Sequence, residues 1–429
     1  MNNNFRLYGR QLDVPNVKFG DPSSESTSPQ SGSMYRKMKI YGPYDKNRIQ
    51  ISEVSLAVVY PKKHEKVVDN FISAFNDGIG SYTGFYSFFK LTTRTFDKIP
   101  VDNNTPEDYA DEITKSTRKN YDLVFIVLDS SGNSDKIYSL SKTLYLSNGI
   151  PCQAINSGRL YSDNSDLQWI VANISLAVYA KIGGTPWVIE AKEKPEIVLG
   201  MSRAMDKNRK VFVGFATIFK SDGDYILFHS KSPVVSWEEY EEQLEELVYK
   251  SLKEYEKQRN LPENIVLHFH KKTGKKEINA VQKAIEMIGK DIKYAILHLN
   301  SYSSFRLFDT SHPTYVPISG LSVRLGARQA LLLSDGRSND KNRRGIGSPY
   351  PLEITMDKAS NMDINEFPRL VKQVYDFSYV NWRAFNANNI PVTINYPYLI
   401  AKLIGNLESI ETWNHLIANG KLVEKAWFI

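Results

Sequence analysis

The feature that most constrains the fold is an alternation of apolar, strand-like runs with amphipathic helical segments. EVSLAVVYP (53–61) and DLVFIVL (122–128) are nearly continuous apolar runs, typical of strands buried on both faces. KKHEKVVDNFISAFNDGIG follows the first run with apolar residues at helical spacing and ends at a glycine. A helix predicted from about Asp135 to Ser147 precedes an extended segment at 150–155. This order predicts a parallel, doubly wound sheet with its ligand site beyond the carboxyl ends of the strands.

The pattern changes beyond Pro186. KVFVGFATIF (210–219) and DYILFHS (224–230) are separated by a short turn and predict an antiparallel meander. The capping box of Ser236 and Glu239 predicts a long helix that runs to about Arg259. Further predicted elements are strands at 264–270 and 293–300, with a helix between them, and a last helical region over 365–405. Three strands, a helix and further strand and helix units outline a ribonuclease H-like domain.

Length and composition narrow the class of protein. A chain of 429 residues suits two domains, and residues 17–35, rich in Ser, Pro and Gly, predict a mobile connection before the first. The single cysteine, Cys152, excludes an internal disulfide and favours a reducing cytoplasm. There is no apolar window of about eighteen residues and no signal-peptide pattern at the N-terminus, so we expect no membrane insertion. The net charge of +6 is compatible with a polyanionic partner.

Three motifs carry a resemblance to a known family. ANISLAVYAKIGGTPWVIEAK (172–192), KYAILHLN (293–300) and NWRAFNANNIPVTINYPYLIAKLI (381–404) resemble segments of the MID and PIWI domains of Argonautes. The resemblance covers about residues 50–429, and its order and length are similar to those of a short prokaryotic Argonaute. It implies an α/β protein with a flexible N-terminal arm (1–36), a Rossmann-like MID domain (37–185) and a ribonuclease H-like PIWI domain (186–429).

The resemblance also implies a site for the 5′-phosphate of a guide strand. Tyr138 and Lys142 resemble the family's tyrosine and lysine one helical turn apart, Gln153 its strand-end glutamine, and Lys181 the lysine that opens KIGG. At this spacing a phenol ring can stack on a base while an ammonium pairs with a phosphate oxygen. Asn173, two turns before Lys181, resembles a further position near the first nucleotide.

Two more assignments come from the resemblance. Arg383 in NWRAF resembles an arginine that contacts the guide backbone. Ile429 ends an apolar AWFI terminus, and its carboxylate could join Gln153 in holding Mg²⁺ or Mn²⁺ at the guide phosphate. A weaker candidate for backbone contacts is a basic segment, read either as a phosphate-tracking loop or as a solvated surface loop; its cations are Arg324, Arg328, Arg337, Lys341, Arg343 and Arg344.

The carboxylates that a two-metal nuclease requires are missing from the matching strands. Ser202 stands where the family's first aspartate is expected, and no acid occurs from Val266 to Gly274. None occurs between Asp376 and Glu408 either, where Asn395 is near the last ligand position. The nearby Asp206 could at most supply one carboxylate. We therefore expect no enzymatic cleavage.

Two other reactive residue types suggest no chemistry. His268 and His270 alternate on a predicted strand and so share one face, but with no third ligand in range packing or phosphate contact is favoured over metal binding. Cys152 has no adjacent histidine and is interpreted as a small buried residue.

The sequence thus predicts a module that binds a guide RNA or DNA and a complementary target, expected to be DNA, without cutting it. The family resemblance implies a role in prokaryotic defence through a separate effector or a partner that supplies the N-terminal half, and a homodimer is possible. Two alternatives stay open. One is a guide-directed nuclease that uses unconventional acids such as Asp206 and Glu277. The other is a nucleotide-binding α/β regulatory protein.

Overall fold

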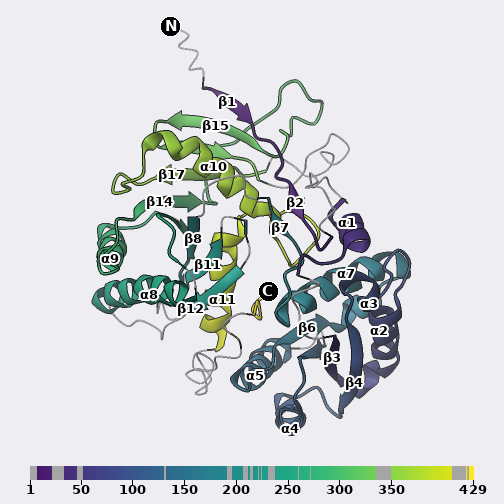
Figure 1. Cartoon of the computed structure of the whole chain (residues 1–429). Helices are drawn as coiled ribbons and strands as arrows, with labels where there is room; N and C mark the ends of the chain where they lie inside the picture. Colours follow the sequence, from purple (N-terminus) through teal and green to yellow (C-terminus); the bar gives the residue numbers. More distant parts are fainter. Residues whose placement is uncertain are drawn as a thin grey trace.

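The computed structural model contains two α/β units with separate sheets (Figure 1). It describes residues 7–21, 33–45, 52–129, 132–190, 196–205, 211–212, 216–220, 222–223, 225–229, 237–258, 260–270, 272–334, 349–407, 422 and 425–429. No helix in these ranges is both long enough and apolar enough to cross a membrane.

The first unit is built on a four-stranded parallel sheet in the order β4-β3-β5-β6. Its strands are β3 (Glu53–Pro61), β4 (Thr92–Val101), β5 (Leu123–Leu128) and β6 (Cys152–Asn156). Its helices are α2 (Glu65–Asp77), α3 (Phe85–Phe89), α4 (Pro106–Ser116), α5 (Ser134–Ser147), α6 (Ser157–Leu160) and α7 (Asn164–Lys181), with a 3₁₀ turn at Lys62–His64. The predicted doubly wound parallel sheet is confirmed.

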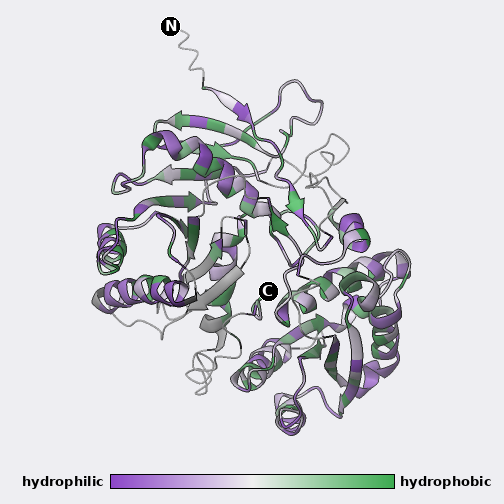
Figure 2. Cartoon of the chain, in the orientation of Figure 1, coloured by the Kyte–Doolittle hydropathy of each residue, from purple (hydrophilic) through white to green (hydrophobic). Residues whose placement is uncertain are grey.

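Helices cover both faces of this sheet, which explains the continuous apolar runs. Along β3, Leu56 and Val58 pack in one cluster with α2 and α7, while Ala57 and Val59 pack in another with α4 and α5. Successive side chains of a strand point to opposite faces of the sheet, so each strand contributes to two cores. In Figure 2 hydrophobic colour accordingly marks β3, whereas the edge strand β4 also carries hydrophilic segments.

The second unit contains a nine-stranded mixed sheet in the order β1-β15-β16-β17-β14-β13-β8-β11-β12. Its strands are β1 (Gly9–Gln11), β8 (Glu196–Met201), β11 (Ala216–Lys220), β12 (Tyr225–His229), β13 (Asn264–His270), β14 (Lys293–Asn300), β15 (Leu321–Gly326), β16 (Gln329–Leu332) and β17 (Leu352–Met356). β8, β13 and β14 are parallel, and β8, β11 and β12 form the predicted antiparallel meander.

Helices also cover both faces of the larger sheet. α8 (Trp237–Gln258) and α9 (Lys275–Glu286) pack on one face, and α10 (Phe367–Asp376) and α11 (Val392–Leu407) on the other. α8 confirms the predicted long helix, although Ser236 of its capping box lies outside the described residues. The predicted last helical region is two helices, with a 3₁₀ turn at Phe377–Tyr379 and a loop between them.

The start of α11 lies against the backbone of β8. A Cβ atom added at Gly200 would lie 1.7 Å from the carbonyl oxygen of Thr393. On the neighbouring strand, the buried His268 accepts or donates a hydrogen bond with Thr393 Oγ1 at 2.7 Å. Burial lowers the pKa of His268 to about 3, so this imidazole is neutral. α11 is thus fixed to the sheet at a position that only glycine permits.

The N-terminal segment differs from the prediction. The expected flexible arm is wrong for the described part of residues 1–36, because β1 pairs with β15 and β2 (Val17–Lys18) pairs with β7 (Val188–Ile189). α1 (Ser33–Tyr41) then packs its Met34, Tyr35 and Met38 in the core. Polar composition did not reveal these short pairings, whose partners are far away in the sequence. The remaining elements are β9 (Ala204–Met205), β10 (Val211–Phe212) and a 3₁₀ turn at Ile364–Glu366.

Candidate functional site

Two of the lysines selected from the sequence converge on one carbonyl oxygen. Lys142 on α5 and Lys181 at the end of α7 donate hydrogen bonds to the Cys152 oxygen, at 2.8 and 3.0 Å. Lys181 Nζ also donates to Gln153 Oε1 at 2.8 Å. The side chains of Lys142 and Lys181 come from elements about forty residues apart in sequence, and the fold joins them at the first residues of β6.

The place of this cluster in the sheet differs from the expected carboxyl edge. α5 runs back from the carboxyl ends of the strands toward their amino ends, as the helix of a right-handed crossover must. Lys142, in the second half of α5, therefore lies beside Cys152 at the amino end of the edge strand β6. The prediction of a ligand site beyond the carboxyl ends is thus wrong for these residues.

The two lysine side chains of the cluster lie close together in a buried site without a carboxylate partner among the described residues. Lys142 and Lys181 are 3% and 1% exposed, and within the described ranges neither forms a salt bridge with a carboxylate. Burial and the neighbouring Lys142 hold the pKa of the Lys181 amine well below its usual range, and Arg383 adds to this effect. A bound anion would relieve the repulsion, so the arrangement is suited to phosphate.

Tyr138 and Arg383 lie near the lysines, and Asn173 contacts the loop that carries Arg383. The Lys142 ammonium lies 5.7 Å from the centre of the Tyr138 ring, close enough for a cation–π contact. Asn173 Oδ1 accepts a hydrogen bond from the Phe385 amide at 3.4 Å, which joins α7 to the loop that carries Arg383. Arg383 is itself exposed. The structure therefore brings Tyr138, Lys142, Gln153 and Lys181 together, with Arg383 near Lys181 and Asn173 joined to the loop of Arg383.

The last residues of the chain reach the same region. Phe428 packs edge-to-face on Tyr396, and Ile429 is 7% exposed. A Cβ atom at Gly183, two residues after Lys181, would lie 3.8 Å from the side chain of Lys425. In Figure 1 the C-terminus lies between the two units.

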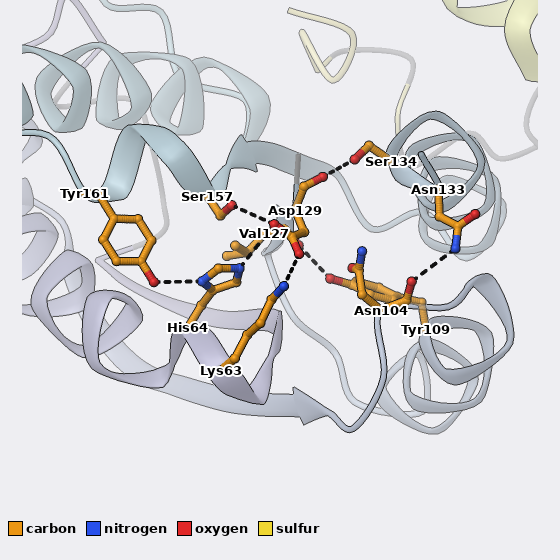
Figure 3. Close-up of polar contacts among 10 residues, drawn as sticks. All are labelled: Lys63, His64, Asn104, Tyr109, Val127, Asp129, Asn133, Ser134, Ser157 and Tyr161. Atoms are coloured by element: carbon orange, nitrogen blue, oxygen red, sulfur yellow. Dashed lines mark hydrogen bonds and ion pairs between the residues drawn. The ribbon is translucent and has the colours of Figure 1, made fainter. Parts of the chain in front are cut away.

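A different polar cluster lies at the carboxyl edge of the small sheet (Figure 3). His64 Nδ1 contacts the Tyr161 hydroxyl at 2.9 Å, and His64 Nε2 lies 3.6 Å from Asp129. Asp129 also forms an ion pair with Lys63 and accepts a hydrogen bond from Ser157. These side chains are bonded mainly to one another, so their polar groups are largely used within the cluster.

Ser202 and His270 stand at the ends of β8 and β13. Ser202 Oγ lies 3.4 Å from His270 Nδ1. Glu277, an acid of the alternative nuclease, accepts hydrogen bonds from Tyr240 at 2.6 Å and from Arg203 at 3.3 Å. Asp206 lies outside the described residues. Among those that are described, no three His, Cys, Asp or Glu side chains gather as a metal-binding group.

The predicted basic loop is partly a β-hairpin. Arg324 lies on β15 and donates hydrogen bonds to the carbonyls of Gly326 and Ala327, and Arg328 donates to that of Asp357. The interpretation as a loop residue is thus wrong for Arg324, whereas Arg328 lies in the short turn between β15 and β16. The other cations of the segment lie outside the described residues; they are Arg337, Lys341, Arg343 and Arg344.

Sequence reasoning did not find the acceptor on which the lysines converge. The Cys152 carbonyl is a backbone group, so no residue type marks it. Ser301, which contacts His270 Nε2 at 3.2 Å, was also missed, because a serine after a strand is common. Only the fold brings the Cys152 carbonyl to the lysines and Ser301 to His270.

A model of the Piwi domain matches residues 123–408, which is more than half of the chain. The chain belongs to the Piwi family. Its ribonuclease H-like second unit and the α/β class predicted from the sequence are thereby confirmed. The Piwi match begins inside the first unit, at β5, so the domain boundary predicted at residue 186 stays a prediction.

Relatives with this Piwi domain include Argonautes. The Protein argonaute of Cereibacter sphaeroides is 28% identical over 92% of this chain and 56% of its own length. The Piwi protein of Archaeoglobus fulgidus is 26% identical, over 88% of this chain and 89% of its own length. A structure of Clostridium butyricum Argonaute bound to a guide DNA and a 19-mer target DNA matches 94% of this chain and 53% of its own, with a TM-score of 0.77 and 18% identity. The chain thus spans about half the length of two of these proteins.

Proposed function

We propose that this Piwi-family chain binds the 5′-phosphorylated end of a guide strand and recognises a complementary target without cutting it. The observation that carries the proposal is the convergence of two buried ammonium groups, from Lys142 and Lys181, on one carbonyl oxygen. Buried charges need compensation, and a terminal phosphate supplies two negative charges and several acceptors. In this proposal Tyr138 stacks on the first base, and Arg383 contacts the backbone that follows.

The absence of cutting is a separate part of the proposal. Two-metal hydrolysis needs several free carboxylates around the scissile phosphate. Ser202 and His270 stand at the ends of β8 and β13, and Glu277 is already bonded to Arg203 and Tyr240. These observations favour binding over hydrolysis.

An assay with a 5′-phosphorylated guide, an end-labelled complementary target and Mn²⁺ tests this part. We expect the labelled target to be retained by the protein and to stay intact over hours. A discrete product within the paired region, lost on substitution Glu277→Gln, would instead establish the nuclease with unconventional acids. Target without guide is the control for non-specific binding.

A divalent cation at the guide phosphate fits the protein groups only in part. Gln153 Oε1 already accepts a hydrogen bond from Lys181, and two ammonium groups lie beside it. The predicted ligands, Gln153 and the Ile429 carboxylate, would supply one neutral and one charged oxygen. We therefore assign the phosphate to the lysines and derive no binding step through a cation.

Removal of divalent cations tests that assignment. We expect EDTA to change the preference for a 5′-phosphate over a 5′-hydroxyl by less than about threefold, because direct charge-assisted bonds carry it. The comparison is repeated with a chain extended by two glycines after Ile429. If EDTA lowers the preference for a 5′-phosphate tenfold in the unextended chain but not in the extended chain, a cation held by the Ile429 carboxylate is required.

A complex that binds its target without cutting it would act through other proteins. We propose that guide-dependent target recognition takes place in the cytoplasm and signals to an effector in prokaryotic defence. The partner would be a protein that replaces the N-terminal half present in longer relatives, or a second copy of the chain. Co-purification from the native host, followed by sequencing of the bound nucleic acid, identifies both partner and guide.

A further inference from the structure

The position of the Lys181 ammonium depends on the glycine turn that ends α7. Lys181 is the last residue of this helix, and its ammonium donates two of the hydrogen bonds of the candidate site. The Gly184 amide donates to the Tyr179 carbonyl at 2.9 Å. The Gly183 amide donates to the Ala180 carbonyl at 3.1 Å, and Gly183 has a φ of 108°. These two bonds form a Schellman motif, so a shift of the turn would move Lys181 as well.

The ring of Tyr179 supports this turn from one side. A Cβ atom added at Gly184 would lie only 2.2 Å from the ring, so the glycine backbone packs against it. The ring is fully buried and stacks on Phe89 of α3, with the two centroids 4.6 Å apart. The place of the Tyr179 side chain therefore limits where the turn can lie.

One buried carboxylate, that of Asp45, holds both the ring and the chain that follows the turn. Its Oδ1 accepts a hydrogen bond from the Tyr179 hydroxyl at 2.6 Å, and its Oδ2 accepts one from the Thr185 amide at 2.7 Å. The Tyr44 amide donates to the Pro186 carbonyl at 2.9 Å. Asp45 is 6% exposed, so both charge-assisted bonds are shielded from water. Burial and the Asp45 carboxylate raise the pKa of Tyr179, so its hydroxyl keeps the proton that it donates.

We propose that Asp45 is a positioning residue for the 5′-phosphate, and that it fixes the Lys181 ammonium by holding the turn at the end of α7. The inference deepens the proposed function and rests on it. Lys181 has to reach the Cys152 carbonyl and the phosphate together, and hydrogen bonds weaken steeply when their geometry is poor. A turn that is held at two points keeps this geometry before the guide arrives, so less order has to be created on binding.

Titration of the full chain with labelled guides that carry a 5′-phosphate or a 5′-hydroxyl tests this role. Asp45→Ala removes both hydrogen bonds, and we expect the preference for phosphate to fall about tenfold, as on loss of one charge-assisted bond. Asp45→Asn should keep most of the preference, because its amide can accept from Thr185 and donate to the Tyr179 oxygen. Equal losses in the two variants would mean that the charge of the carboxylate, and not the position of the turn, sets the preference.

Asp163→Ala is the matched control, because Asp163 caps the opposite end of the same helix. Its Oδ1 accepts hydrogen bonds from the amides of Ser165 and Asp166. Loss of this N-cap should lower the urea midpoint of unfolding and leave the preference for phosphate at the wild-type value. A preference that falls as far as in Asp45→Ala would show that Asp45 only stabilises α7.

A double-mutant cycle with Lys181→Met separates positioning from general stability. If Asp45 acts through Lys181, Asp45→Ala should lower the preference no further in a chain that already carries Lys181→Met. An equal further loss in that chain would overturn the inference. If Asp45→Ala does not fold, Tyr179→Phe takes its place in the cycle, because it removes one of the two bonds and keeps the ring.

The wild-type protein separates this inference from the proposed function. If the wild type shows no preference for a 5′-phosphate, the proposed function fails. If the wild type shows the preference and folded Asp45→Ala keeps it in full, only the positioning role is wrong.

Discussion

Replacing both buried lysines, Lys142→Met with Lys181→Met, is expected to remove the preference of the protein for a 5′-phosphorylated guide. A charge-assisted hydrogen bond contributes about 1.5–3 kcal/mol. The loss of two such bonds should therefore lower the preference for phosphate over hydroxyl by about 100-fold or more. Methionine keeps the length of the buried stem, so the unfolding free energy of the unliganded protein should change by no more than about 1 kcal/mol. Titration of labelled guides with either 5′ end measures the effect.

Lys136→Met is the control for this pair. Lys136 lies on the same helix, α5, but is exposed. Its loss should weaken both guides equally and only slightly, through the general attraction for nucleic acid. Undiminished phosphate preference in the double variant would place the 5′-end pocket elsewhere. Displacement of the guide by an equal concentration of a mononucleotide would favour the regulatory nucleotide-binding protein instead.

Gly200→Ala is expected to destabilise the protein more than other single-methyl additions. The new Cβ would overlap the Thr393 carbonyl oxygen, and both are backbone groups that cannot rotate away. Either β8 or the start of α11 must shift, which is expected to cost about 3 kcal/mol. Because α11 also packs against α5, guide affinity should fall together with stability. The urea midpoint of unfolding and the guide affinity are the two measurements.

Gly326→Ala makes the matched comparison. Gly326 lies on β15, is exposed, and a Cβ there would meet nothing within 4 Å. Its unfolding free energy, obtained from the urea transition, should stay within about 0.5 kcal/mol of the wild-type value. Equal midpoints for the two variants would mean that α11 is not held against β8 as the structure shows.

The sequence predicted elements best where burial left a clear apolar pattern. β3 and β5 were found because they are nearly continuous apolar runs that are buried on both faces. β4 was missed because TTRTFDKIPV is an edge strand with only its last residue buried. β15 and β16 were missed since arginines and glycines suggested a loop, whereas the pairing that makes them strands comes from distant segments.

The site shows the same division. The spacing of Tyr138 and Lys142 within one helix was readable, and the family resemblance supplied Gln153 and Lys181. The convergence of these side chains could not be predicted from the sequence, because it depends on where α5 and α7 return to the sheet. The rule that places ligands beyond carboxyl strand ends favoured the edge with His64 and Asp129, whose groups are bonded mainly to one another.

The pairing of β1 with β15 has a consequence for biosynthesis. Gly9, Arg10 and Gln11 align with Val323, Ser322 and Leu321, and the Gln11 amide donates to the Ser319 carbonyl at 2.6 Å. A ribosome makes the β1 segment long before β15, because the two strands are some three hundred residues apart in the sequence. During synthesis β1 therefore has no strand partner until β15 has been made, so this edge of the large sheet forms only after most of the chain exists.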